Sequence, residues 1–134
     1  MDVSMGEEAL VESQIADSIA LINSLDEADK PSIAIWYYFS DAGEWRLLIA
    51  GQSFDALLPK DEARAYQKIA EALNKAQLSS LTMSEIKLVR TDYPLLKATG
   101  HLIKTPADAI VRAHFKDTSV NGTFIKEMLI LRSS

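Results

Sequence analysis

Apolar residues near the start of the chain recur at intervals of three and four positions, which is the spacing of one helical face. The stripe consists of Val11, Ile15, Ile19 and Ile22. It predicts a helix over residues 5–25. Ser4 and Glu7 have the spacing of a capping box, and Glu7 and Glu8 suit the positive end of the helix dipole.

Residues 32–40 read S-I-A-I-W-Y-Y-F-S, and their β-branched and aromatic side chains predict a strand. Both alternating faces of this strand are apolar, which is typical of a strand inside a sheet or covered on both sides. Residues 41–44 have the composition of a turn. A second strand over 45–50 would then complete a hairpin with a four-residue connection.

Residues 51–59 are expected to form a connection that leads into a second main helix over residues 60–77. Pro59 is expected in the first turn of this helix. Asp61 and Glu62 lie near its N-terminus, where negative charge is favourable.

The next segment predicts two shorter elements. Residues 85–90 alternate as E-I-K-L-V-R and predict a short strand. Residues 93–103 are predicted to be a short helix, with Asp92 as its cap, Pro94 in its first turn and Gly100 at the end of its regular part.

The last part of the chain predicts a second hairpin, with strands over 109–117 and 123–132 and a turn at Asn121-Gly122. A two-residue loop sets Lys116 opposite Glu127, a favourable pair of charges. The residues predicted to share one face of this hairpin are Val111, Ala113, Phe115, Met128 and Ile130. The last strand is apolar on both faces near its end, so we expect it inside the sheet.

These elements predict a single α+β domain over residues 1–134, in the order α-β-β-α-β-α-β-β. Hairpins at both ends favour a five-stranded, mostly antiparallel sheet. The two main helices, over 5–25 and 60–77, are expected to pack on one face of this sheet.

Three motifs resemble a family of small uncharacterised bacterial proteins. Residues 36–50 read W-Y-Y-F-S-D-A-G-E-W-R-L-L-I-A, in which an aromatic strand leads through an acidic turn into E-W-R-L. An A-Y-x-x-I pattern begins at Ala65, and a V-N-G hairpin begins at Val120. The resemblance covers residues 33–76 and 110–132. It implies a fold outline and carries no catalytic residue, because that family has no established activity; Leu58-Pro59-Lys60 stands where a glycine is expected.

Composition narrows the possible chemistry. The chain has no cysteine, which excludes disulfides, thiol nucleophiles and thiolate metal sites. Residues 1–30 carry eight acids and one lysine (−7), and residues 31–134 carry eleven acids and thirteen basic residues (+2), which together give the net −5. The absence of a basic leader and of a long apolar run predicts a cytoplasmic protein without a membrane partner. The mildly basic remainder makes nucleic-acid binding the least favoured function.

The first hairpin carries the candidate ligand or partner site. Its residues are Trp36, Tyr38, Asp41, Glu44, Trp45 and Arg46. They could form a polar site between aromatic surfaces. The alternative is a solvated turn with the tryptophans in the core, and the composition of the turn alone favours that alternative.

No other motif points to catalysis. His101 and His114 have no metal-ligand spacing, and His114 alternates with Arg112 and Lys116 as a small basic patch or as the wet side of a strand. The chain has no serine elbow, P-loop or dinucleotide-binding glycine pattern.

The sequence therefore favours a non-enzymatic interaction or accessory protein without cofactor or metal, and the resemblance implies that it is bacterial. Three features point to self-association, for instance as a homodimer, or to a basic protein partner. They are the edges of the two hairpins, the acidic first helix, and the crowding of Trp36, Tyr37, Tyr38 and Trp45 on the first hairpin. The alternative is a small-ligand-binding module or a weak enzyme with a pocket near the first hairpin.

Overall fold

The computed structural model describes residues 9–78 and 80–134 of the chain. Its helices are α1 (Glu12–Leu25), α2 (Gln52–Asp55), α3 (Glu62–Ala76) and α4 (Pro94–Thr99), with a 3-10 turn η1 (Met83–Glu85). Its strands are β1 (Ile33–Phe39), β2 (Glu44–Ala50), β3 (Ile86–Leu88), β4 (Ala113–Val120) and β5 (Thr123–Ser133). The α+β class and the five strands are as predicted.

The five strands form one mixed sheet in the order β3-β2-β1-β5-β4. Three of the four strand pairs are antiparallel, so the sheet is mostly antiparallel as predicted, and β3 runs parallel to β2. The parallel pair follows from the connection, because β2 and β3 are joined through α3 and such a crossover returns the chain in the same direction.

The interior position predicted for the last strand is confirmed, because β5 lies between β1 and β4. The predicted register of the second hairpin is also confirmed, with Lys116 opposite Glu127. Asn121 and Gly122 have φ angles of 48° and 79°, which match a tight turn with two left-handed residues. On its other side, β5 shifts register against β1 between Ala34 and Ile35.

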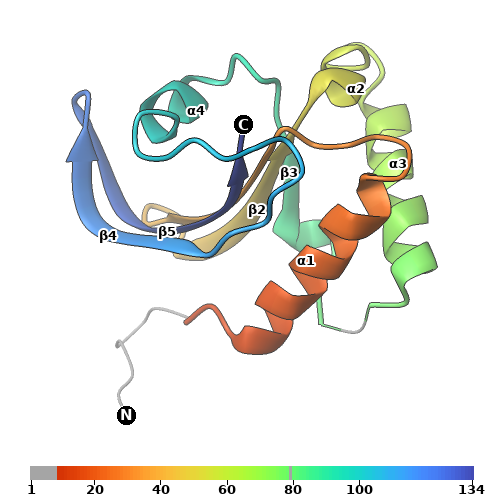
Figure 1. The fold of residues 1–134 in the computed structure, drawn as a ribbon, viewed down its shortest axis with the longest axis horizontal. Helices are drawn as coiled ribbons and strands as arrows, with labels where there is room; N and C mark the ends of the chain where they lie inside the picture. The colour runs from red at the N-terminus through yellow and green to blue at the C-terminus, as the bar shows by residue number, and fades with distance from the viewer. Residues whose placement is uncertain (1–8, 79) are drawn as a thin grey trace.

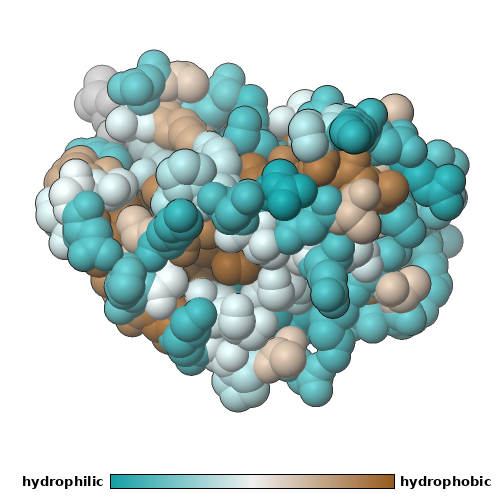
Figure 2. Space-filling view, turned by 90° about the horizontal axis from the view of Figure 1, so that it is seen from above, coloured by the Kyte–Doolittle hydropathy of each residue, from teal (hydrophilic) through white to brown (hydrophobic). Residues whose placement is uncertain are grey.

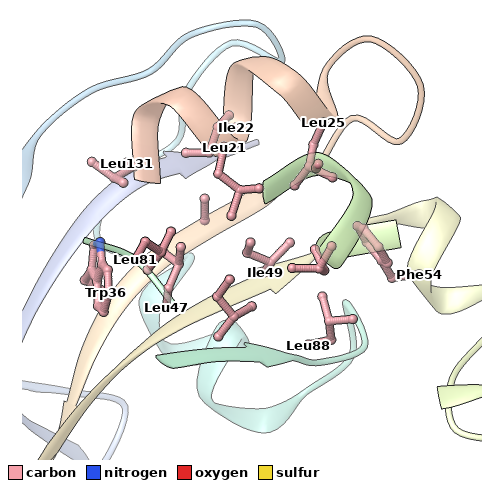
Figure 3. Close-up of a cluster of buried hydrophobic side chains, with 14 of the residues drawn as sticks. Leu21, Ile22, Leu25, Trp36, Leu47, Ile49, Phe54, Leu81, Leu88 and Leu131 are labelled. Atoms are coloured by element: carbon pink, nitrogen blue, oxygen red, sulfur yellow. The ribbon is translucent and has the colours of Figure 1, made fainter. Parts of the chain in front are cut away.

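Each face of the sheet carries its own core. Trp36, Leu47, Ile49 and Leu131 project from one face toward α1 and α3, so the prediction that both main helices pack on one face is confirmed (Figures 1 and 3). The opposite face is covered by α4 and the segments around it, with Leu96 packed against the sheet. Seen from above Figure 1, hydrophobic and hydrophilic residues are mixed over the surface (Figure 2).

The first helix begins later in the described residues than the apolar stripe predicts. Residues 9–11 are not helical, and α1 begins at Glu12 after Val11. The backbone N–H of Val11 donates to Oε1 of Gln14 at 3.3 Å, which caps the first turn. The predicted capping residues Ser4, Glu7 and Glu8 lie outside the described residues.

The start of the second main helix also differs from the prediction. Asp61 is its N-cap and accepts a hydrogen bond from the Arg64 backbone N–H at 3.3 Å. Pro59 therefore precedes the helix rather than lying in its first turn, and it follows a cis peptide bond with Leu58. The connection before it contains the short helix α2. A helix of four residues is too short to show a repeating pattern of apolar positions, so the sequence did not predict it.

The remaining differences are at the ends of elements. The strand predicted over 85–90 shortens to β3, and the helix predicted over 93–103 shortens to α4. Asp92 does not cap α4; Tyr93 is at the N-cap position, while Asp92 accepts from Arg90 Nε at 3.2 Å. Pro94 in the first turn and Gly100 at the C-cap agree with the prediction.

The strand predicted over 109–117 instead runs from Ala113 to Val120. Val111 therefore lies before β4, although its N–H donates to the Leu131 carbonyl at 2.8 Å. The other members of the predicted face, Ala113, Phe115, Met128 and Ile130, do pack in one core.

Candidate interaction site

The aromatic side chains of the first hairpin lie in the core. Trp36 is fully buried, and its indole N–H donates to Ser18 Oγ on α1 at 3.0 Å. Tyr38 is opposite Trp45 across β1 and β2, with ring centroids 5.5 Å apart. Both are at least nine-tenths buried, because this face of the hairpin lies under the helical layer. The aromatic surface that a concave binding site would need is therefore turned inward.

The polar residues of the same hairpin remain near water. Asp41 is exposed in the turn, next to a stretch in which Gly43 adopts a φ of 67°. Glu44 forms an ion pair with Arg46, and their side chains are 49% and 30% exposed. Exposed pairs of this kind contribute little to stability, so the pair mainly satisfies the two charges locally.

A hollow of about 300 Å³ lies beside this hairpin. The hairpin residues that line it are Glu44, Trp45 and Arg46, and the others are Ala9, Gln14, Ser84 and Glu85. The structure thus brings half of the six predicted site residues together with segments far away in the sequence. Small-ligand sites begin at about this volume.

The polar groups around the hollow mostly bond to one another. Gln14 Nε2 donates to Glu85 Oε2, and Glu85 Oε1 accepts from the Thr82 backbone N–H at 3.0 Å. Glu44 and Arg46 are already paired. Side chains that satisfy each other leave fewer donors and acceptors directed at a ligand.

The second surface of interest is the free edge of β4. β4 is eight residues long and lies at the end of the sheet, with β5 as its neighbour. The opposite edge is β3, which is only three residues long, and the Leu88 N–H there donates to the Tyr66 hydroxyl at 3.0 Å. Within the part of the chain that is described, β4 thus presents the longer open row of backbone groups.

The basic row around His114 is balanced by acids. Arg112 pairs with Glu12 of α1 at 2.7 Å, and His114 Nε2 lies 2.7 Å from Glu127 Oε2. Lys116 is opposite the same Glu127 in the register. The acidic first segment thus meets this basic row directly, which leaves a mixed surface rather than a cationic one.

Phe124 is an exposed apolar residue that the sequence pattern did not single out. It lies opposite Ser119 at the tip of the second hairpin, and 58% of its surface is exposed. The signals available in the sequence were its place beside a turn and its alternation with the apolar Ile125, which the structure buries fully. A large exposed aromatic side chain next to an open edge is a natural contact for a partner.

Two basic residues of the last third are held by contacts inside the protein. Arg132 is fully buried, and Arg90 donates to the backbone carbonyls of Asp55 and Leu58. Among the described residues, no group of three or more histidine or acidic side chains is placed to hold a metal ion.

Among the ionisable groups of residues 9–78 and 80–134, two have shifted pKa values. Burial, together with the nearby Tyr93 hydroxyl, raises the pKa of the Tyr37 phenol. The hydrogen bond and charge of Lys30 hold the pKa of Asp108 below its ordinary value. Tyr37 projects into the core under α4, and Asp108 is exposed, so neither lies in the first-hairpin site.

Comparison with known proteins does not assign a function to these surfaces. Protein-family models, curated proteins and solved structures give no match to the chain. No helix among the described residues is long and apolar enough to cross a membrane. The site must therefore be interpreted from its own geometry.

Proposed function

We propose that the chain is a non-enzymatic interaction protein, and that it binds a protein partner by strand addition at the open edge of β4. The observation that carries the proposal is the eight-residue edge strand, which has β5 on one side and no strand from the described residues on the other. Unpaired N–H and C=O groups along such an edge are a template for another strand, and peptide recognition commonly uses it.

The side chains around the edge support this function. β4 carries four half-buried and four exposed side chains, so an added strand would meet both apolar and polar neighbours. Phe124 offers an exposed ring one strand away, beside Ser119. Arg112 and His114, next to this edge, each lie beside a glutamate. An incoming strand would therefore not meet a cluster of charges of the same sign.

A photo-crosslinking amino acid at Ser119 tests the proposal in the native cell. Ser119 is exposed on the edge strand, and the matched control is Arg64, an exposed position on α3. We expect a discrete protein adduct from Ser119 and none from Arg64. No adduct from Ser119, or the same adducts from both positions, would contradict binding at β4.

A small-ligand site beside the first hairpin is the second candidate, favoured by the hollow of about 300 Å³ next to Glu44, Trp45 and Arg46. It ranks second because its polar groups bond to each other. A ligand screen by thermal shift tests it, with Arg46→Ala as the variant that should lose any response. A response that survives in Arg46→Ala would place the ligand elsewhere.

A further inference from the structure

The burial pattern of β4 is symmetric about its own centre. Its half-buried positions are Ala113, Phe115, Thr118 and Val120. Its exposed positions are His114, Lys116, Asp117 and Ser119. Read from either end, the strand gives the same order of half-buried and exposed side chains, with the midpoint between Lys116 and Asp117.

The symmetry arises from a change of phase within the strand. Side chains of a regular strand alternate, so Phe115 and Asp117 would share a face. Asp117 instead adopts a φ of 48°, in the left-handed region that aspartate tolerates better than most residues. Beyond it, the half-buried positions fall on Thr118 and Val120. The ladder with β5 skips Asp117 and keeps the same register on both sides of it, while the Asp117 carboxylate lies 3.6 Å from Lys126 Nζ of β5.

A self-complementary strand is what a two-fold dimer requires, because the same surface must match itself. We infer that the partner at the open edge of β4 is a second copy of this chain, with the two β4 strands antiparallel about an axis between Lys116 and Asp117. This inference rests on the proposed function and names its partner. The two sheets would join into one continuous sheet of ten strands, five from each copy.

This register matches both burial and charge. Phe115 lies opposite Thr118 of the second copy, and Ala113 lies opposite its Val120, so half-buried positions meet half-buried positions. Lys116 lies opposite Asp117 of the second copy, and symmetry repeats this pair. Opposite charges on facing strands are favourable. A shift by one residue would set half-buried positions against exposed ones and lose the match.

The absence of cysteine allows a clean test of the register. In the inferred dimer, His114 lies opposite Ser119 of the second copy, and facing Cα atoms in antiparallel strands are about 4.5–5.5 Å apart, within disulfide range. His114 and its own symmetry mate would be separated by five residues along the strand, about 17 Å. His114→Cys and Ser119→Cys are therefore purified separately, mixed and oxidised.

We expect the mixture to give a disulfide-linked dimer, and each variant alone to give none. Size-exclusion chromatography with light scattering of the unmodified chain should shift its mass from 14.8 kDa toward twice that value. The control mixture is His114→Cys with Arg64→Cys on α3. Cross-linking in the control as fast as in the test mixture would overturn the inferred register.

The two proposals fail in different ways. A monomeric mass with no mixed disulfide, together with a Ser119 photo-adduct of another protein, overturns self-association and leaves strand addition at β4 in place. A monomeric mass with no Ser119 adduct overturns both. Circular dichroism of the cysteine variants verifies that each is folded; His114 and Ser119 are both exposed, so the changes should leave the fold intact.

Discussion

Arg132 and Asp26 form a two-pronged ion pair, at 2.7 and 3.0 Å, that joins β5 to the C-terminal end of α1. The guanidinium is fully buried. Its remaining donors reach the backbone carbonyls of Pro31, Asp108 and Ala109, so all five N–H groups have an acceptor. One side chain thus fixes the end of the first helix and the loop before β4 to the central part of the sheet.

Asp26→Asn should destabilise the fold strongly. Asparagine keeps the size of the side chain but removes the charge that compensates the buried guanidinium, and such a loss costs on the order of 3 kcal/mol. The matched control is the adjacent Glu27→Gln. Glu27 pairs with Lys75 at an exposed site, so losing this ion pair should lower the free energy of unfolding by less than about 1 kcal/mol. Urea unfolding of both variants gives the comparison. Equal losses would contradict a special role for the buried pair.

Ser18→Ala should reveal the hydrogen bond that holds Trp36. The indole N–H of Trp36 would lose its acceptor at 3.0 Å in a fully buried site, which costs about 1–3 kcal/mol. Ser24→Ala on the same helix is the control, because Ser24 Oγ is only part-buried and 3.4 Å from its acceptor. Unfolding followed by tryptophan fluorescence measures both. A change in Ser18→Ala no larger than in the control would contradict the prediction.

Tyr37 should make the fold sensitive to alkaline pH. Its pKa is raised by burial and by Tyr93, so the unfolded chain loses the phenol proton first as the pH rises past about 10. The folded state then binds more protons than the unfolded state, and stability falls as the pH rises toward the folded pKa. Tyr37→Phe should reduce this alkaline loss, measured by urea unfolding at neutral and high pH. An unchanged pH profile would show that Tyr37 is not its source.

Lys116→Glu and Asp117→Lys should each weaken self-association and should complement each other when mixed. Each variant alone sets two pairs of like charges against each other across the inferred axis. In a mixed dimer, the two substituted side chains face each other with opposite charges, and the native Asp117 of one copy faces the native Lys116 of the other. Light scattering of the single variants and of the mixture measures this. Failure of the mixture to associate better than either variant would contradict the inferred pairing of Lys116 with Asp117.

The local part of this fold was predictable from its sequence. The turn dipeptide Asn121-Gly122 determines the hairpin register, and so Lys116 could be placed opposite Glu127 from the chain alone. Apolar residues on both faces likewise placed β5 inside the sheet, and they predicted that β1 is either inside the sheet or covered on both sides. Both inferences use neighbouring residues, whose geometry is fixed by the chain itself.

The features that sequence reasoning missed depend on distant partners. Arg132 looks like an ordinary surface cation until Asp26, 106 residues away, is placed beside it. The alternation of apolar and polar side chains over residues 86–88 is the same beside a parallel or an antiparallel strand, so it could not predict the parallel pair with β2. The strand-helix-strand order was a usable signal for that pair. The turn composition of the first hairpin favoured core positions for its two tryptophans, which the structure bears out, but nothing local shows which helices cover them.

The place of β5 between β1 and β4 has a consequence for synthesis on the ribosome. Residues 123–133 are synthesised after every other strand. The edge of β1 that pairs with β5 therefore stays unpaired until β5 has been made, although β1 is apolar on both faces. Exposed apolar strands with open edges are prone to aggregate. Ribosome-bound chains of increasing length should therefore gain protease resistance only once β5 has left the exit tunnel. If shorter nascent chains were equally resistant, the first hairpin and its helices would form a stable unit without the strand at their centre.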